Sequence, residues 1–207
     1  MISWCLVMKK SVDGLNLIIP KDVYDPAEDS FLLAENVIVQ ENQKVLEVGS
    51  GSGYVTLFLA KKYPTVEFFC LDINYSAAIT TNRNAEENKQ QLNVFSADLF
   101  SSLLSNRKNP FFDIIIFNSP YLPYTEEGNL ERAWAGGKDG LEIVTPFIEN
   151  LSQYLKRSGF SYLVVSSKTN IPKLIELFKS NNWFYKQQDK IVEGKEEIIL
   201  FKITQNP

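Results

Sequence analysis

The run Lys44-Val45-Leu46-Glu47-Val48 leads directly into the loop Gly49-Ser50-Gly51-Ser52-Gly53. Its β-branched and apolar side chains are typical of a buried strand. Residues 54–63 then have the pattern of a helix, which Pro64 would end. A strand, a glycine-rich loop and a helix in this order begin a βαβ unit. The stretch therefore predicts an α/β fold.

The rest of the chain continues this alternation. Six further segments have the pattern of strands, and a short turn at Glu193-Gly194 makes the last two antiparallel. Residues 1–21 read as an irregular lead-in or a weak hairpin with a turn at Asp13-Gly14. The sequence thus predicts a three-layer α/β fold with a seven-stranded, mostly parallel sheet and an antiparallel C-terminal hairpin. The expected strands cover residues 44–48, 66–71, 92–95, 112–117, 160–165, 183–190 and 196–203.

Helix signals lie between these strands. Pro26 suits the first turn of one helix, Asn74 can cap another, and Ser158-Gly159 is a stop signal. Besides residues 54–63, the expected helices cover about residues 26–37, 74–88, 99–104, 141–155 and 171–180.

Composition limits the possible functions. The 207 residues suit one domain over 1–207, with a short lead-in at 1–22. The net charge of -4 gives no overall basic field that would attract nucleic acid. The absence of histidine excludes histidine-based acid–base chemistry and Ser-His-Asp triads. Cys5 and Cys70 lack the spacing of metal ligands, so no metal site is expected.

The compartment follows from two further features. Cys70 lies in an apolar run and is expected to be a buried, reduced thiol. The apolar segment 1–8 is too short for a secretory signal and its lysines come after it, and no stretch is long enough to span a membrane. We therefore expect a cytoplasmic protein.

Polar features stand at the carboxyl ends of the first four strands. The glycine loop follows the first, and Asp72, Asp98 and Asn118 follow the next three. Ligands of open α/β sheets bind at this edge. Each feature alone is weak, because glycines serve ordinary turns and loop carboxylates often cap helices. Together they predict a cofactor site.

A nicotinamide dinucleotide is one candidate, because an acid about 20 residues after the glycines is typical of its site. However, Gly53 comes one place too early for G-x-G-x-x-G. No Lys-Ser or Lys-Thr pair follows the loop, which argues against phosphate-loop nucleotide hydrolysis. The second acid, Asp98, points instead to an adenine amino group.

Asn118-Ser119-Pro120-Tyr121 could form a small planar clamp. The Asn118 carboxamide oxygen and a nearby backbone carbonyl both accept hydrogen bonds. Together they could hold a planar –NH2 group, with the ring of Tyr121 packed over its face. The alternative is an ordinary Pro-Tyr turn after a strand.

These motifs resemble those of class I S-adenosylmethionine-dependent methyltransferases that act on amino groups. Two more specific stretches narrow the resemblance to the HemK-like glutamine methyltransferases of class 1 translation release factors, in their eukaryotic and archaeal branch. They are Val23-Tyr24-Asp25-Pro26-Ala27-Glu28-Asp29-Ser30 and Ala133-Trp134-Ala135-Gly136-Gly137-Lys138-Asp139-Gly140. The resemblance runs from about Val23 to the C-terminus.

The resemblance implies S-adenosylmethionine as the cofactor. Asp72 would accept from the ribose hydroxyls, Asp98 would accept from the adenine amino group, and Leu99 would donate from its backbone. Gly51 and Gly53 would let the backbone approach the cofactor without a Cβ clash.

Other residues would hold the methionine part of the cofactor. The resemblance places Glu47, Gly49 and Ser30 there, with Tyr24 as a lid. The full cofactor set is Tyr24, Ser30, Glu47, Gly49, Gly51, Gly53, Asp72, Ile73, Asp98, Leu99 and Asn118. The catalytic set is Asn118, Ser119, Pro120 and Tyr121, and no metal is implied.

Three positions depart from the family's usual pattern. Asp25 replaces Glu, and Ser30 replaces Thr but keeps the hydroxyl. Ser119 stands where the clamp usually has Pro. The resemblance assigns its backbone carbonyl a role, which Ser also supplies, and Pro120 biases Ser119 toward an extended conformation. We expect retained activity and an unfolded-state entropy cost of about 0.4–1 kcal/mol.

The implied substrate is the side-chain amide of the Gln in the Gly-Gly-Gln loop of a class 1 release factor. Positioning and electrostatic preorganisation need no strong base, so the missing histidine is no obstacle. The same clamp suits adenine N6 in DNA or RNA, reached by base flipping or in single strands. A lysine methyltransferase and a cofactor-binding scaffold without activity are further alternatives.

The resemblance also implies a small zinc-binding activator protein as a partner. It would pair along the third strand, at Leu92-Asn93-Val94-Phe95, where a bare apolar edge is a liability. Alternatively, Val94 and Phe95 face the sheet's own helices.

Overall fold

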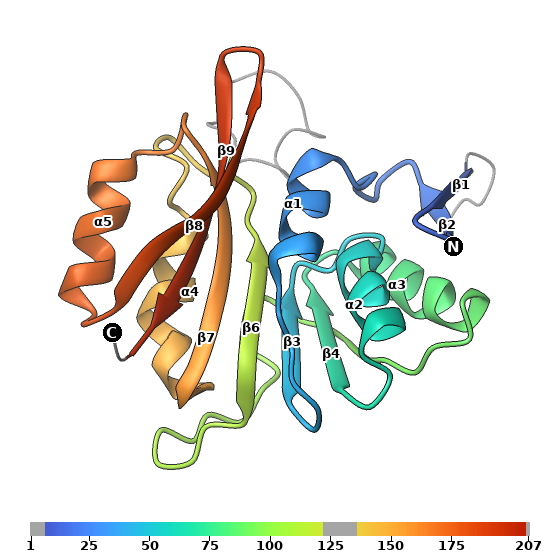
Figure 1. Ribbon diagram of the computed structural model, residues 1–207, viewed down its shortest axis with the longest axis horizontal. Helices are drawn as coiled ribbons and strands as arrows, with labels where there is room; N and C mark the ends of the chain where they lie inside the picture. The colour runs from blue at the N-terminus through green and yellow to red at the C-terminus, as the bar shows by residue number, and fades with distance from the viewer. Residues whose placement is uncertain (1–6, 122–135, 206–207) are drawn as a thin grey trace. The chain divides into compact units, whose positions relative to one another are not determined.

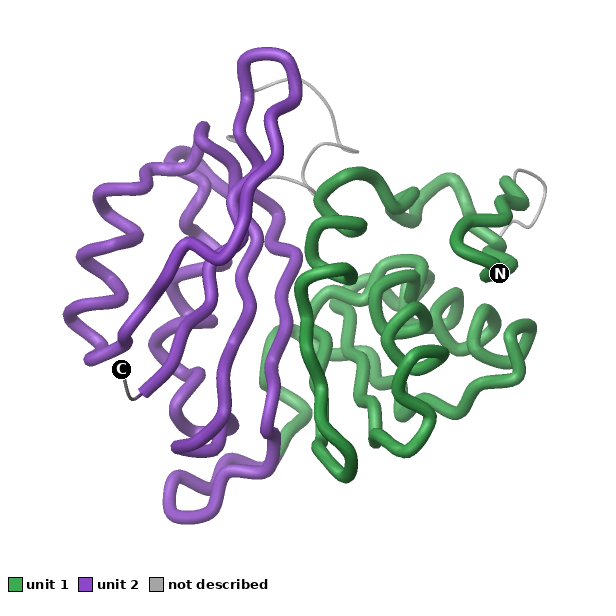
Figure 2. Tube along the Cα trace, in the orientation of Figure 1, with its two compact units in different colours: residues 1–103 green, residues 104–207 purple. Residues whose placement is uncertain are grey.

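The computed structural model describes residues 7–121 and 136–205. The chain forms two compact units, residues 1–103 and 104–207, which Figure 2 colours separately. Three strands of the first unit and four of the second belong to the mixed, mostly parallel sheet of the fold, as the sequence predicts. The single domain over 1–207 stays a prediction.

The first unit contains a parallel sheet in the order β5-β4-β3. Its strands are β3 (Lys44–Val48), β4 (Glu67–Asp72) and β5 (Asn93–Ser96). β3 is buried over its last four residues, whereas β5, the terminal strand, is largely exposed. This agrees with the polar residues at both ends of β5.

The first unit also contains α1 (Glu28–Asn36), α2 (Tyr54–Lys62) and α3 (Tyr75–Glu87), visible in Figure 1. Asn74 caps α3 with its side chain, which accepts a hydrogen bond from the Ser76 amide. The helices at 26–37, 54–63 and 74–88 are thus confirmed to within two residues at each end.

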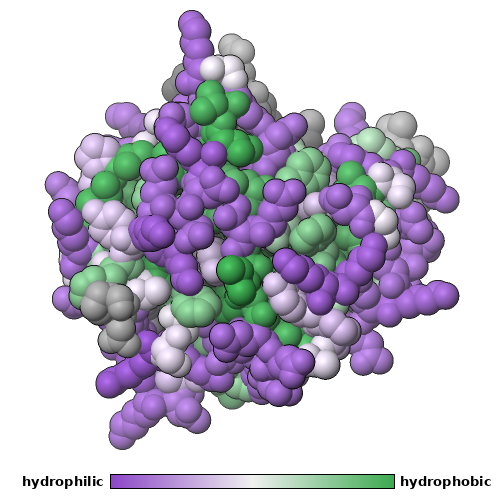
Figure 3. Space-filling model, viewed as in Figure 1, coloured by the Kyte–Doolittle hydropathy of each residue, from purple (hydrophilic) through white to green (hydrophobic). Residues whose placement is uncertain are grey.

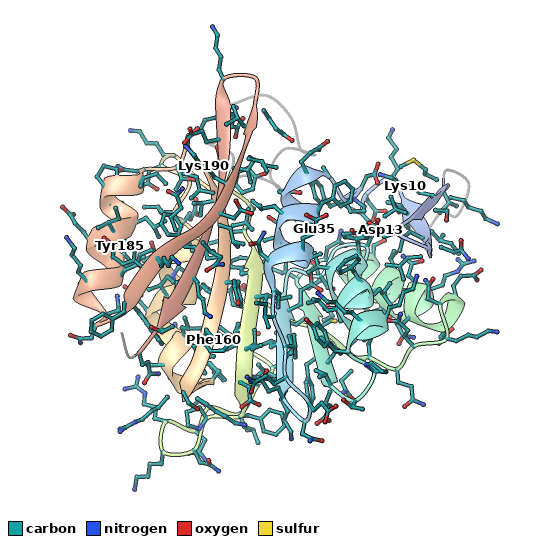
Figure 4. The ribbon with its side chains drawn as sticks, in the orientation of Figure 1. Lys10, Asp13, Glu35, Phe160, Tyr185 and Lys190 are labelled. Carbon is teal, nitrogen blue, oxygen red and sulfur yellow. The ribbon has the colours of Figure 1, made fainter. Side chains whose placement is uncertain are left out.

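The lead-in is a hairpin of β1 (Val7–Val12) and β2 (Leu15–Pro20). Asp13 and Gly14 both have positive φ, 51° and 68°, as a tight two-residue hairpin turn requires. Tyr54 at the start of α2 donates to the carboxylate of Asp13, labelled in Figure 4, at 2.6 Å. The hairpin is therefore fastened to the helix that follows the glycine loop.

The second unit contains a sheet in the order β6-β7-β9-β8. β6 (Phe112–Asn118) and β7 (Leu155–Ser166) are parallel. β8 (Phe184–Glu193) and β9 (Glu196–Thr204) form the predicted antiparallel hairpin.

The helices α4 (Val144–Asn150) and α5 (Ile171–Ser180) cover one face of this sheet. The strand registers place Phe117, Leu163 and Phe201 in one row on that face. Phe117 packs on Phe147 of α4 with ring centroids 4.8 Å apart, and Phe201 packs on Phe178 of α5 at 5.8 Å. Aromatic packing therefore forms the core between helices and sheet.

Three sequence predictions between residues 99 and 159 were wrong. Residues 99–104 form turns, because Leu99 has a φ of 45°, outside the helical region. The helix expected over 141–155 is α4 followed by a 3-10 turn, η2 (Leu151–Gln153). Gly159 lies inside β7, where a Cβ would come within 2.4 Å of the Asp113 carbonyl oxygen. It permits a close approach to β6 and does not end a helix.

The surface carries little contiguous apolar area on the face shown in Figure 3, where hydrophobic residues form separate patches among hydrophilic ones. Cys70 is a free, buried thiol, as expected. None of the helices in residues 7–121 and 136–205 is long and apolar enough to cross a membrane. Cys5 lies outside the described residues.

Candidate active site

The glycine loop follows β3 in a conformation that requires its glycines. Gly49, Gly51 and Gly53 have φ values of 71°, 55° and 83°, in the left-handed region. The amide of Gly49 donates to the Leu71 carbonyl at 2.8 Å, and the amide of Gly53 donates to the Ser50 carbonyl at 2.7 Å. The loop is thus a closed turn tied to the end of β4.

Helix α3 holds the loop from a second side. The Thr81 hydroxyl donates to the Gly51 carbonyl at 3.1 Å and lies 2.9 Å from the Ser50 hydroxyl. The Asn84 amide group donates to the Ser52 carbonyl at 2.9 Å. Asn84 is completely buried and also bonds both the amide and the carbonyl of Ile18 in β2. One side chain therefore joins the hairpin to the glycine loop.

Asp72 stands beside the loop at the end of β4. Its two carboxylate oxygens accept from the amides of Gly51 and Asn74, each at 2.8 Å. Burial raises the pKa of this carboxyl, and the two amide bonds offset part of that rise. The carboxylate therefore organises the loop in addition to any contact with a ligand.

The segment after β5 reaches the same place. The Ala97 amide donates to the Asp72 backbone carbonyl at 2.9 Å, so Asp98 and Leu99 follow directly beside the end of β4. Asp98 is exposed, and the adjacent Ile73 is 70% exposed although apolar. The first unit thus brings Asp72, Ile73, Asp98 and Leu99 to one end of its sheet.

Tyr24 lies near the loop as well, and Asp29 connects it to Ser30. A Cβ on Gly51 would be 3.6 Å from the Cβ of Tyr24. The Tyr24 hydroxyl and the Ser30 amide both donate to the carboxylate of Asp29, at 2.9 Å and 2.6 Å. Asp29 is 5% exposed and joins the two predicted cofactor residues.

Glu47 has a different environment. Its side chain is 2% exposed and accepts hydrogen bonds from the amide and the hydroxyl of Thr56 in α2. Burial raises its pKa to about 8, against the lowering effect of the Thr56 bonds. Cys70, its partner in the β3–β4 register, is also fully buried, and burial raises the pKa of its thiol. Glu47 fastens β3 to α2, and its contact with the methionine part stays a prediction.

The clamp follows β6 in the second unit. Asn118 is the last residue of β6 and lies opposite Val164 of β7. Ser119 is 3% exposed, and its hydroxyl donates to the Val164 carbonyl at 2.7 Å. Pro120 and Tyr121 are half-buried.

Residues 136–140 pack against the clamp. A Cβ on Gly136 would come within 2.3 Å of the Pro120 carbonyl oxygen, and one on Gly140 within 3.0 Å of the Tyr121 carbonyl oxygen. Both glycines are therefore needed for the close approach. Asp139 fixes this loop by accepting from Lys173 of α5 at 2.6 Å, which lowers the pKa of the Asp139 carboxyl. Ala133, Trp134 and Ala135 lie outside the described residues.

Sequence reasoning missed several residues that shape the glycine loop in the first unit or the clamp in the second. Asp29 has a local signal, since it precedes Ser30 in a quoted motif. Thr81 and Asn84 are three residues apart on a helix and face the same way, but nothing in the sequence says what they face. The Ser119 hydroxyl could be assigned only once β7 was known to lie beside β6.

Comparisons with known proteins place the chain in a family. The model of the methyltransferase small domain family matches residues 21–192. The putative protein N5-glutamine methyltransferase MJ0928 of Methanocaldococcus jannaschii is 37% identical over 81% of this chain and 84% of its own length. Human methyltransferase HEMK2 is 34% identical over 89% of this chain and 91% of its own length.

The solved Mtq2–Trm112 complex from E. cuniculi, described as responsible for methylation of the eRF1 translation termination factor, shares the fold. Its matching chain has a TM-score of 0.70 at 22% identity and covers 89% of this chain and 99% of its own. Fold and family model together define an enzyme of the class I methyltransferases. Within that class, the chain belongs to the HemK-like family of protein glutamine methyltransferases.

Proposed function

We propose that this protein transfers a methyl group from S-adenosylmethionine to the side-chain amide nitrogen of the Gln in the Gly-Gly-Gln loop of a class 1 translation release factor. The observation that carries the proposal is the anchored clamp: Asn118 is the last residue of β6, and the hydroxyl of the following Ser119 is bonded to β7. The names of the relatives, protein N5-glutamine methyltransferase and eRF1 methylation complex, support it. With such a substrate, we expect the enzyme to act in the cytoplasm.

The residues of the first unit fit S-adenosylmethionine. Each oxygen of the Asp72 carboxylate accepts one backbone amide and keeps lone-pair capacity for a ribose hydroxyl. Ile73 offers an exposed apolar surface for a flat base, and Asp98 is also exposed. When bound, the cofactor supplies an electrophilic methyl group on a sulfonium ion.

The clamp residues act on the amide substrate. An amide nitrogen is a weak nucleophile, because its lone pair is delocalised into the carbonyl. Asn118 Oδ1 and the Ser119 carbonyl accept hydrogen bonds from the two N–H groups of the substrate amide and fix its orientation. The Tyr121 ring packs on the amide plane. Positive charge that develops on the nitrogen meets these two fixed acceptors. As the N–C bond forms, the bond between the methyl carbon and the sulfonium sulfur would break with its electron pair going to sulfur, and one N–H proton would be released to water.

A small zinc-binding activator protein pairs with the edge of β5 in this proposal. β5 is the terminal strand of its sheet, and its Phe95 is 42% exposed. Pairing would cover both the strand edge and this ring. Co-expression with the activator is expected to raise solubility and affinity for S-adenosylmethionine, and equal behaviour of the chain alone would remove the partner from the account.

The substrate class is tested by parallel incubations with labelled S-adenosylmethionine. The arms contain a release factor, the same factor with Gln replaced by Ala in its Gly-Gly-Gln loop, and single-stranded DNA and RNA rich in adenine. We expect label in the first arm only. Label confined to nucleic acid would instead establish an adenine methyltransferase, and label in the Gln-to-Ala factor would indicate another acceptor such as lysine.

A further inference from the structure

Ser119 is the most deeply buried residue of the clamp. Its side chain lies against β7, where the hydroxyl donates to the Val164 carbonyl at 2.7 Å. Val164 is itself completely buried and pairs with Leu200 of β9 on its other side. The hydroxyl therefore ends on a rigid strand in the interior of the second unit.

The hydrogen bond between Ser119 and Val164 lies at the end of the backbone ladder between β6 and β7. Asn118, opposite Val164, is the last residue of β6. Pro120 has no N–H, so it cannot continue the ladder. The Ser119 hydroxyl extends the attachment of β6 to β7 by one residue, up to the peptide whose carbonyl the mechanism uses.

The following peptides are fixed from the other side. The Pro120 and Tyr121 carbonyls abut Gly136 and Gly140, where no Cβ would fit without displacement. The Ser119 carbonyl thus lies between two restraints, its own side chain on β7 and the glycine loop 136–140. Without the hydroxyl, one of these restraints is gone.

We propose that Ser119 is a positioning residue, whose hydroxyl is anchored on Val164 and holds the Ser119 carbonyl in place as the second acceptor of the clamp. This inference rests on the proposed function. A proline here, the usual residue of the family's clamp, restricts φ with its ring but has no donor for Val164. This chain uses a hydrogen bond to reach the same rigidity.

The test compares Ser119→Ala with Ser161→Ala and Ser119→Thr. Ser161, in β7, is also completely buried, and its hydroxyl has no hydrogen-bond partner among the described residues. Ser161→Ala therefore removes a buried hydroxyl, as Ser119→Ala does, but breaks no hydrogen bond among the described residues. We expect Ser119→Ala to lower kcat by about tenfold or more, with unchanged affinity for S-adenosylmethionine. Ser119→Thr keeps the hydroxyl and should recover most of the loss, and Ser161→Ala should leave kcat unchanged.

Hydrogen exchange of peptides covering 112–121 gives a readout that needs no activity. Faster exchange in Ser119→Ala than in Ser161→Ala supports the positioning role. Equal exchange in the two variants overturns it, as does a Ser119→Ala protein that is less stable but keeps its kcat at a temperature where it is folded. A wild-type protein that methylates no Gln refutes the proposed function, and the exchange comparison then still decides the positioning claim.

Discussion

Asp72 organises the glycine loop and is proposed to bind the cofactor as well. It holds the amides of Gly51 and Asn74 and retains capacity for further donors. We predict that Asp72→Ala raises the dissociation constant for S-adenosylmethionine about tenfold to a hundredfold, the loss expected for hydrogen bonds to a charged group. Calorimetry measures this, with Asp22→Ala, an exposed acid, as the control for net charge. An unchanged dissociation constant would remove Asp72 from the cofactor site.

Glu47 makes stability depend on pH. Its folded pKa is about 8, whereas a free carboxyl has the ordinary value of 4.5, so the folded state binds the extra proton between these values. The contribution of this proton to the free energy of unfolding is complete below pH 4.5. It decreases by up to about 1.4 kcal/mol per pH unit as the pH rises and is lost once the pH passes 8.

The side chain in Glu47→Gln cannot ionise, so this part of the pH dependence of the free energy of unfolding should disappear. We predict that its free energy of unfolding, measured with urea at pH 5, 6, 7 and 8, rises steadily relative to wild type with increasing pH. Glu87→Gln, a change at an exposed position, is the control for replacing one carboxyl by an amide. A constant difference between Glu47→Gln and wild type would mean that Glu47 titrates at its ordinary pKa.

Helix α3 supports the cofactor loop through Asn84. This side chain bonds the amide and carbonyl of Ile18 and the carbonyl of Ser52, all of which would lose a partner in Asn84→Ala. We predict a loss of about 3 kcal/mol in the free energy of unfolding, with weaker binding of S-adenosylmethionine. Asn82→Ala, on the same helix but exposed and with a side chain that donates to Glu86, should change stability by less than about 0.5 kcal/mol. Similar losses for both variants would contradict the bracing role.

The loop 136–140 supports the clamp in the second unit. Gly140 and Gly194 have similar φ values of 74° and 61°, but only Gly140 has close neighbours. Alanine at either site should cost about 1 kcal/mol for the left-handed backbone. We predict that Gly140→Ala costs more and lowers kcat, because the added methyl displaces the Tyr121 carbonyl, while Gly194→Ala leaves kcat unchanged. Equal kcat values for the two variants would show that the contact is irrelevant to the site.

Across the molecule, the elements predicted well are those whose signals are local. The apolar run of β3 followed by glycines with positive φ, and the Asn74 cap of α3, needed no tertiary information. The errors arise at residues whose conformation or role depends on contacts with elements distant in sequence. Gly159 resembles a helix stop but serves the contact of β7 with Asp113, and Leu99 adopts a left-handed φ that its residue type disfavours.

The site divides in the same way. Asp72, Asp98 and Asn118 could be located because the carboxyl ends of parallel strands are predictable positions. The roles of Asn84 and the Ser119 hydroxyl could not be predicted, because their hydrogen-bond partners lie on elements distant in sequence. The role of Asp29 could not be predicted either, because its sequence neighbours do not show which way its side chain points. The residues that support the candidate site are thus harder to predict than the residues proposed to form it.

The central claim is tested most directly by locating the methyl group. Wild-type protein and Asn118→Ala, each with the activator protein, are incubated with S-adenosylmethionine and a release factor, and the Gly-Gly-Gln peptide is sequenced by mass spectrometry. The account predicts one added methyl on the Gln side-chain nitrogen with wild type, and none with Asn118→Ala, which should still bind the cofactor. An unmodified Gln in the wild-type reaction, or full methylation by Asn118→Ala, would contradict it.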